Sequence, residues 1–554
     1  MSMKNTSVAP KTFGATNQQP KPLVARSTRD EPRSRLRESA FAKPAMADKA
    51  TADKPSPAAL RFHLSHRCFA DCSHQNSGQP GIKGVTHVNR IIILLALAVS
   101  YQLSAFAQGP LTPPGAPAPS MLTLSQVEPR TPITNTTAVT ISTPGSYYLT
   151  ANITVGTGDG IDINVDGVTL DLNGFTISST AATPNGTAIL LNGGNTDITI
   201  LNGHILGTSF ASGINYSGTA PVNARVSGVS VSSSAYGIML GTASPTVVDY
   251  CTVQSIGVYG IQASSVSHSS AYLCGSAAIN ANTAETCYGN CTGSGDGFYV
   301  GTANNCYGYS SSGYGLYATT ATGCYGLTDT GTAGLDANNA INCYGVSNGS
   351  NPGLLATTAS NCQGQNNASG DGLDATTANN CQGACAGLGT GLSATETATG
   401  CYGFSADFVG LMASNAENCN GKSSNGEGLT ATMANNCYGA SYGSGSSPGL
   451  EASNAENCQG ISYGNGTGLE AITANNCQGL SSGNGTGLLA YNANNCYGNT
   501  SSGWGLYVYQ VATGCYGFSS TGPALFAANA NFCFGSGTAV VVAGNWYNMP
   551  TPTP

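Results

Sequence analysis

Two glutamates occupy equivalent places in consecutive copies of a repeated word of nineteen residues. Glu451 and Glu470 each fill the variable position of a Gly-Leu-x-Ala segment. If the copies stack as neighbouring β-strands, their backbones lie ~4.8 Å apart. Carboxylates paired at that separation serve a retaining glycosidase or bind calcium. The alternative is two solvated side chains that splay apart, which is the arrangement we expect, so the pair stands as the catalytic candidate without an assigned role.

A tyrosine follows most of the regularly spaced cysteines of the C-terminal half. Aromatic rings arrayed along a rod could stack on the sugar rings of a glycan, and a self-stacked column that stiffens the coil is the simpler alternative. Gln363 and Gln382 interrupt the series. The candidate ligand-binding residues are therefore Tyr288, Tyr307, Tyr325, Tyr344, Tyr497 and Tyr516.

The cysteines themselves are spaced about 19 residues apart from Cys287 to Cys533. The residue before each one is Asn or Gly at most copies, and these two residues share little except tolerance of positive φ. We therefore expect a left-handed corner there, with the cysteine pointing inward as a small apolar core residue. The members that define this ladder are Asn305, Asn342, Asn361, Cys306, Cys324, Cys343 and Cys362.

The oxidation state of the ladder has two interpretations. Stacked coils bring cysteine Cα atoms within disulfide range, but side chains in register project in parallel and leave their Cβ atoms too far apart. We expect buried, reduced thiols. Cys291 and Cys385 each stand four residues after a ladder cysteine and are predicted to lie in accessible turns.

Each period contains two short strand-like words separated by Gly/Ser turns. Helical repeats would need apolar residues at 3.6 spacing and few glycines, so the pattern predicts an all-β, single-stranded, right-handed parallel β-helix with ~19-residue coils in the C-terminal half. We expect roughly twenty coils. Irregular coils are predicted for 142–286, Cys-ladder coils for 287–543, and a C-terminal cap or tail for 544–554.

The N-terminal quarter of the chain has a different composition. Residues 85–107 contain an apolar run from Ile91 to Val99 and an Ala-x-Ala cleavage signal ending at Ala107, which predicts a signal peptide near residues 88–107 and export to the outer cell surface or beyond. Residues 1–84 are predicted to be a disordered extension, or a mistranslated one if translation starts near Val85 or Val88. Residues 108–141 form a Pro-rich linker and N-terminal cap.

Charge limits the possible partners. Only 8% of the residues are charged. The part of the chain after Ala107 contains 20 acidic and three basic residues, which gives it a net charge of −17. Such a surface repels nucleic acid, anionic lipid and polyuronates. No membrane span beyond the signal, no metal and no cofactor is predicted, with calcium at the paired glutamates as the alternative. The sequence does not indicate an oligomeric state.

Upstream of the cysteine repeats, the chain carries GSYYLTANITV, GIDINVDGVTLDLNGFTISS and GNTDITILNGHILG. These β-branched runs, together with GPLTPPGAPAP and EPRTPI, resemble the secreted right-handed parallel β-helix repeat proteins of environmental bacteria, within the pectin-lyase-like superfamily. The resemblance covers about Gln108 to Tyr250 well and the rest by architecture alone. It implies the fold, and it implies an activity less securely because most such proteins are functionally uncharacterised.

Relatives with known activities include pectate lyases and polygalacturonases. Asn195-Thr196-Asp197 matches one polygalacturonase motif and Gly203-His204-Ile205 half-matches another, while the paired Asp and basic motifs of that family are missing from the sequence. We therefore predict a non-catalytic exported protein, structural or glycan-binding and adhesive, which contacts an extracellular polysaccharide or cell-surface glycan. The alternative is a polysaccharide lyase or glycoside hydrolase.

Overall fold

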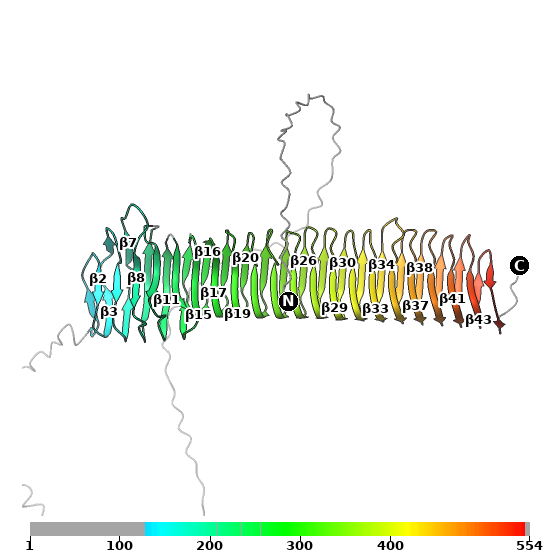
Figure 1. The fold of residues 1–554 in the computed structure, drawn as a ribbon, viewed down its shortest axis with the longest axis horizontal. Helices are drawn as coiled ribbons and strands as arrows, with labels where there is room; N and C mark the ends of the chain where they lie inside the picture. Colours follow the sequence, from blue (N-terminus) through cyan, green and yellow to red (C-terminus); the bar gives the residue numbers. More distant parts are fainter. Residues whose placement is uncertain (1–127, 208, 234, 255, 549–554) are drawn as a thin grey trace, which may run out of the picture. The chain divides into compact units, whose positions relative to one another are not determined.

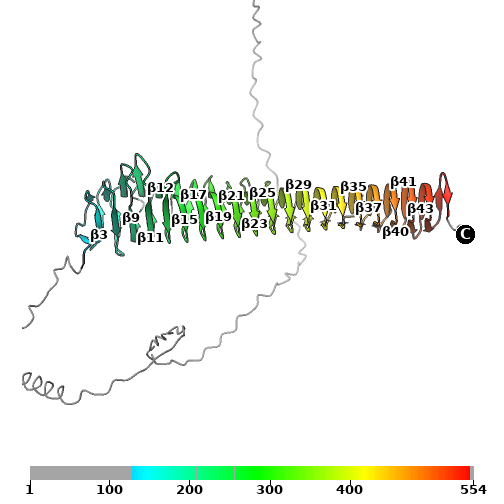
Figure 2. The ribbon, with the colours of Figure 1, turned by 90° about the horizontal axis from the view of Figure 1, so that it is seen from below.

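The computed structural model describes residues 128–548, except 208, 234 and 255. The predicted extension 1–84, the predicted signal 85–107 and most of the linker 108–141 lie outside the described residues. Residues 128–548 form a right-handed parallel solenoid of about 22 turns. Figures 1 and 2 show the strands side by side in one stack, with the colours passing from cyan to red along it.

The solenoid begins earlier and ends later in the chain than we expected. Its first strand is β1 (Thr131–Ile133), and its last is β46 (Trp546–Tyr547). The described residues contain no helix, and therefore none long and apolar enough to cross a membrane. With ~4.8 Å per coil, about 22 turns give a stack ~100 Å long.

Each coil has three outward faces, which we name from one regular coil. Strand β21 (Leu316–Thr322) contributes two of them, because its ladder to β23 (Leu335–Ile341) is broken at Thr319. Face A comprises Leu316–Ala318 and its equivalents, and face B comprises 320–322 and its equivalents. Face C comprises β22 (Tyr325–Thr328), which pairs in parallel with β24 (Tyr344–Ser347).

The three faces originate as separate strands at the N-terminal end. Face B starts with β1 paired to β3 (Gly145–Leu149), and face A starts with β2 (Val139–Ile141) paired to β5 (Ile161–Ile163). Face C starts with β4 (Ile153–Val155) paired to β7 (Thr176–Ser179). Every pairing along the three faces is parallel, so like positions of successive coils lie above one another.

The corner between faces B and C is left-handed, as the sequence predicts. Asn305, Asn342 and Asn361 have φ of 52°, 53° and 53°, and Gly323 has φ of 61°. The corner reverses the inward and outward alternation between the last buried alanine of face B and the following cysteine. Cys306, Cys324, Cys343 and Cys362 consequently point inward, each no more than 3% exposed.

The interior of the ladder half is narrow because two glycines per coil let backbones touch. A Cβ added to Gly345 on face C would lie 2.2 Å from the carbonyl oxygen of Gly353, which begins face A of the next coil. A Cβ on Gly334 would lie 2.3 Å from the carbonyl oxygen of Val346. The remaining interior is filled by one leucine, two alanines and one cysteine per coil, for example Leu335, Ala337, Ala340 and Cys343.

Face C ends in a column of buried hydroxyls that fasten the following turn. The Ser310 hydroxyl donates to the carbonyl of Gly295 at 2.6 Å and accepts from the amide of Gly313 at 2.7 Å. Cys291 and Cys385 occupy this same position at the ends of β18 (Tyr288–Cys291) and β28 (Gln382–Cys385). The prediction that they lie in accessible turns is wrong, since they are 0% and 1% exposed.

Candidate functional site

The predicted tyrosine column lies on the outside of face C. Tyr288, Tyr307 and Tyr325 stack in sequence, with ring centroids 5.1 and 4.7 Å apart and ring planes within 8° of parallel. Tyr497 and Tyr516 stack at 5.6 Å with planes 3° apart. Because both faces of the Tyr307 ring are covered by its neighbours, that ring presents only its edge to solvent.

Tyr344 departs from this stack. Its ring meets Tyr325 edge-on, with an interplanar angle of 77°, and its hydroxyl donates to Gln365 Oε1 at 2.5 Å. Tyr344 is therefore not stacked face to face on Tyr325. The geometry of Tyr288, Tyr307 and Tyr325 is the one expected of a stiffening column, and the parallel stack ends at Tyr344.

The candidate carboxylates lie on face A, where Glu451 and Glu470 are direct register partners on β35 (Leu450–Glu456) and β37 (Leu469–Asn475). A third carboxylate, Glu427, stands at the start of face A one coil earlier and accepts a hydrogen bond from Thr430 at 2.6 Å. Burial is the main cause that raises the pKa of Glu451, and the negative charges of Glu427 and Glu470 raise it further. Burial is also the main cause that raises the pKa of Glu470, and the negative charge of Glu427 adds to it.

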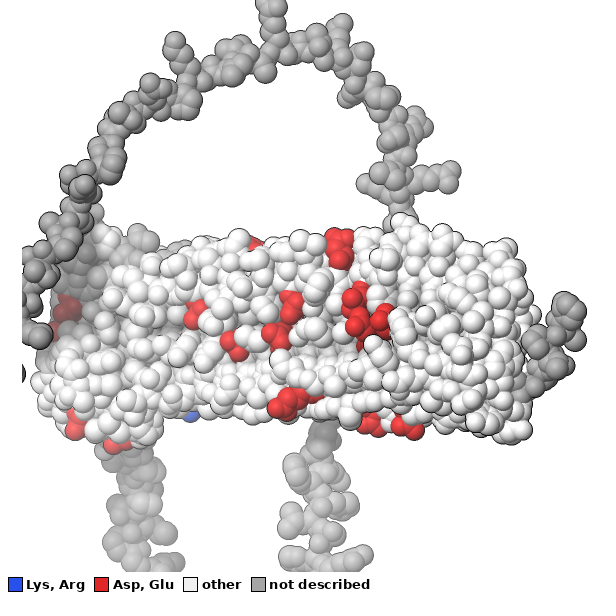
Figure 3. All heavy atoms as spheres, turned by 45° about the vertical axis from the view of Figure 1, so that its right-hand side comes forward, with Lys and Arg blue, Asp and Glu red and all other residues white. Residues whose placement is uncertain are grey.

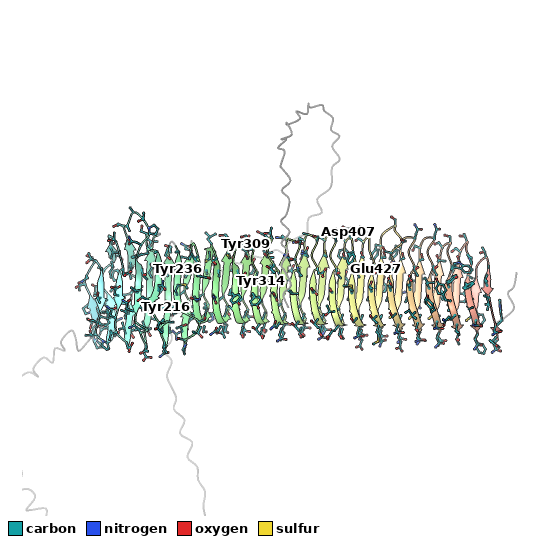
Figure 4. All side chains as sticks on the ribbon, in the orientation of Figure 1. Tyr216, Tyr236, Tyr309, Tyr314, Asp407 and Glu427 are labelled. Carbon is teal, nitrogen blue, oxygen red and sulfur yellow. The ribbon has the colours of Figure 1, made fainter. Side chains whose placement is uncertain are left out.

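Other carboxylates are scattered along face A. Burial raises the pKa of Asp296 and Asp336, and burial followed by the charge of Asp371 raises that of Asp374. Figure 3 shows acidic side chains spread over the surface with almost no basic ones among them. In Figure 4, Glu427 and Tyr314 lie on the broad face of the stack, and Tyr309 and Asp407 lie at its turn edge.

No group of three or more His, Cys, Asp or Glu side chains between 128 and 548 is arranged to hold a metal ion, as far as those residues are described. The carboxylates on face A are dispersed along the axis rather than convergent. What Glu451 and Glu470 have in common is a pKa raised mainly by burial, which is the property of a general acid.

Face B carries two outward columns on either side of its buried alanines. The first column is Thr or Asn at every ladder coil except Met433 and Val511: Thr283, Thr302, Thr320, Asn339, Thr358, Thr377, Thr397, Asn415, Asn454, Thr473, Asn492 and Asn529. The second column is mostly Asn, Thr, Ser or Glu. Between them lies a hollow of 330 Å³ over Ala416, Ala434 and Ala455.

The thiol ladder offers no exposed chemistry. The eighteen cysteines from Cys251 to Cys533 are unpaired and buried. The Cys343 thiol donates to the carbonyls of Ala321 and Ile341, each at 3.3 Å. Burial raises the pKa of Cys251 to about 11 and that of Cys274 to about 12. These two thiols precede the ladder, and as protonated thiols they are poor nucleophiles and poor metal ligands. The ladder thiols are kept from reagents and metal ions by their burial.

Sequence reasoning missed three features of this surface: Glu427, the hollow on face B, and the openings in the tyrosine column at Gln459 and Gln478. A signal for each was present, because column membership follows from alignment of the nineteen-residue words. Glu427 precedes Gly428-Leu429 in the coil before Glu451. Only side-chain orientation, such as the turned ring of Tyr344, lies beyond such an alignment.

These features define the class of the protein: a right-handed parallel β-solenoid with a buried cysteine ladder and a repetitive outer surface. No family model, no curated protein and no solved structure matches the chain.

Proposed function

We propose that the protein is an exported, non-catalytic rod that binds a neutral polysaccharide outside the cell or on its surface, as a distant member of the secreted parallel β-helix proteins of the pectin-lyase-like superfamily. The observation that carries the proposal is face B, where two columns of mostly amide and hydroxyl side chains repeat once per coil beside a hollow of 330 Å³ that Met433, Glu417 and Glu456 also line. Such side chains recognise sugar hydroxyls through hydrogen bonds.

The spacing of face B suits a linear polymer. A β-linked pyranose chain advances about 5 Å per sugar, close to the ~4.8 Å between coils, so successive sugars meet equivalent side chains. Each contact is small, and many in-register contacts add through effective concentration. The charge of the chain after Ala107, −17, favours a neutral glycan over an acidic one.

The test is retention of the full-length protein on neutral and acidic polysaccharides, with released reducing ends measured in the same samples. Retention without cleavage on a neutral polymer is the expected result. Asn415→Ala with Asn454→Ala removes two exposed amides at the hollow and is expected to weaken retention severalfold. Thr467→Ala with Thr486→Ala, at the start of face A, is the control and is expected to retain full binding. No retention on any polysaccharide would overturn the proposal.

A second candidate function is a retaining glycoside hydrolase on face A. It is favoured by the register pairing of Glu451 with Glu470 and by the raised pKa of both. Backbones ~4.8 Å apart allow the carboxylate separation of about 5 Å that retention requires. Under this alternative, wild-type protein releases reducing ends and Glu451→Gln or Glu470→Gln abolishes the release, while Glu456→Gln on the same strand as Glu451 keeps it.

A further inference from the structure

The tyrosine column of face C has two openings of the same size. The register runs from Tyr344 through Gln363 and Gln382 to Tyr402, and again from Tyr438 through Gln459 and Gln478 to Tyr497. In each case two consecutive coils replace a ring with a glutamine. The flanking tyrosines are therefore three coils apart, or ~14 Å, instead of ~4.8 Å.

The first opening is a hollow in the surface. Its volume is 360 Å³, and its lining includes Asn342, Asn361 and Asn380 from the left-handed corner and Tyr344, Gln363 and Gln382 from face C. The corner asparagines directly follow the second column of face B, so the hollow adjoins the proposed polysaccharide track. Gln363 and Gln382 are both exposed, and their amides offer donors and acceptors to a ligand.

One wall of this hollow is held in place by a chain of hydrogen bonds. The Tyr344 hydroxyl donates to Gln365, and Gln365 Nε2 donates to Asn367 Oδ1 at 2.7 Å. Asn367 in turn donates to Asn348 at 2.7 Å, and Asn348 donates to Asp329 at 3.0 Å. A ring fixed in this way loses little conformational freedom when a sugar packs on it.

A third interruption of the column shows what a closed gap looks like. At Asn420 a single ring is missing between Tyr402 and Tyr438, and the ammonium of Lys422 lies 5.7 and 6.0 Å from those two ring centroids. The protein therefore fills this one-coil gap with its own cation. At the second two-coil opening, Gln459 Nε2 donates to Gln478 Oε1 at 3.4 Å.

We propose that the two glutamine openings are equivalent subsites, each of which holds a segment about two sugars long of a neutral polysaccharide that runs along the rod. This inference rests on the proposed polysaccharide-binding function and adds its specificity sites. The glutamine and corner asparagine amides bind hydroxyls, and the flanking tyrosine faces pack on the apolar face of a sugar. The openings lie five coils apart, ~24 Å, so a chain of about seven sugars reaches both.

The openings can be closed with the residue that the protein itself uses at neighbouring coils. Gln363→Tyr with Gln382→Tyr continues a column that already stacks at Tyr288, Tyr307 and Tyr325, so we expect the full-length variant to fold and to lose the first subsite. Gln459→Tyr with Gln478→Tyr does the same for the second. The probes are neutral β-1,4- and β-1,3-linked gluco- and manno-oligosaccharides of two to twelve sugars, with affinity measured by calorimetry.

For wild-type protein we expect affinity to rise at least tenfold once the oligosaccharide spans both openings, and closing either opening should remove that rise. If a tyrosine variant fails to fold, Gln363→Ala with Gln382→Ala removes the amides without added bulk and should also remove it. Wild-type binding that the closed and alanine variants leave unchanged would overturn the two subsites while leaving the proposed function standing. Wild-type protein that binds none of these oligosaccharides and no polysaccharide would overturn both.

Discussion

The left-handed corner between faces B and C gives a quantitative prediction. Residues in this column share one backbone conformation but differ in the free energy that they need to adopt it. Asn361 has φ of 53° and Thr286 has φ of 51° in the same column. Both are exposed, and the amide of each donates to the next coil at 2.9 Å, to Asn379 and Asn304 respectively. The difference between them is therefore the cost of a β-branched side chain in the left-handed region.

That cost is about 1–2 kcal/mol per residue, and Asn avoids much of it through local hydrogen bonding. Thr286→Asn should stabilise its coil by roughly this amount, and Asn361→Thr should destabilise its own coil equally. A stacked array does not unfold as one two-state unit, so local opening is the appropriate quantity. Hydrogen exchange with mass spectrometry should show protection of the mutated coil rising about 5–30-fold for the first variant and falling as much for the second.

The control is Thr320→Asn, at a face B position where Asn339 is already tolerated in the next coil. It should leave protection unchanged, because φ there is extended. Unchanged protection in both corner variants, or a loss of protection in Thr286→Asn, would refute the argument that conformation alone selects Asn and Gly at this corner.

Three further predictions follow from the interior and the charges. Gly345→Ala should destabilise its coil by about 1–3 kcal/mol through overpacking, while Gly445→Ala, whose added Cβ meets nothing within 4 Å, should be neutral by the same exchange measurement. Native protein should leave the eighteen buried thiols unreactive to a thiol reagent and expose all of them on denaturation, and disulfide-linked peptides in mass spectra would contradict this. Burial raises the pKa of Asp371 and Asp374, so their contribution to stability is complete below the unfolded-state pKa and is lost as pH rises through the folded-state pKa. The free energy of local opening of their coils, from hydrogen exchange corrected for the intrinsic rate at each pH, should therefore be higher near pH ~4 than near pH ~7.

Much of the solenoid follows from the sequence because its constraints are local and repeated. Asn or Gly before a cysteine predicts the corner, and the corner together with Gly-Leu-x-Ala predicts which residues point inward. The division of β21 into two faces was also available, since Thr319 and Thr320 are consecutive outward residues between the buried Ala318 and Ala321. A bend is the simplest way for two successive side chains to face solvent.

The candidate site was less accessible to sequence reasoning, for two physical reasons. Cys291 was predicted to lie in an accessible turn because it stands four residues after a ladder cysteine, but it is in register with Ser310, whose hydroxyl is a buried fastener of the following turn. The tyrosine column could be predicted as outward-facing, but whether its rings stack or turn depends on partners such as Gln365, which lies on the following coil. Such rotamer choices are set by neighbours across the stack rather than along the chain.

The narrow interior restricts where this protein can bind anything. In most ladder coils, the inward glycine of face C lies against the backbone that begins face A, so the space inside is filled mainly by leucine, alanine, cysteine and small hydroxyl side chains, with Phe298 as the largest exception. A ligand must therefore be met on the outside. There, parallel register repeats every outward residue type at the coil spacing, which produces long uniform columns and few convergent clusters. Convergence is what catalysis needs, and repetition is what a linear polymer needs. A departure from uniformity, such as a pair of glutamines in a column of tyrosines, is then the feature that distinguishes one stretch of the rod from another.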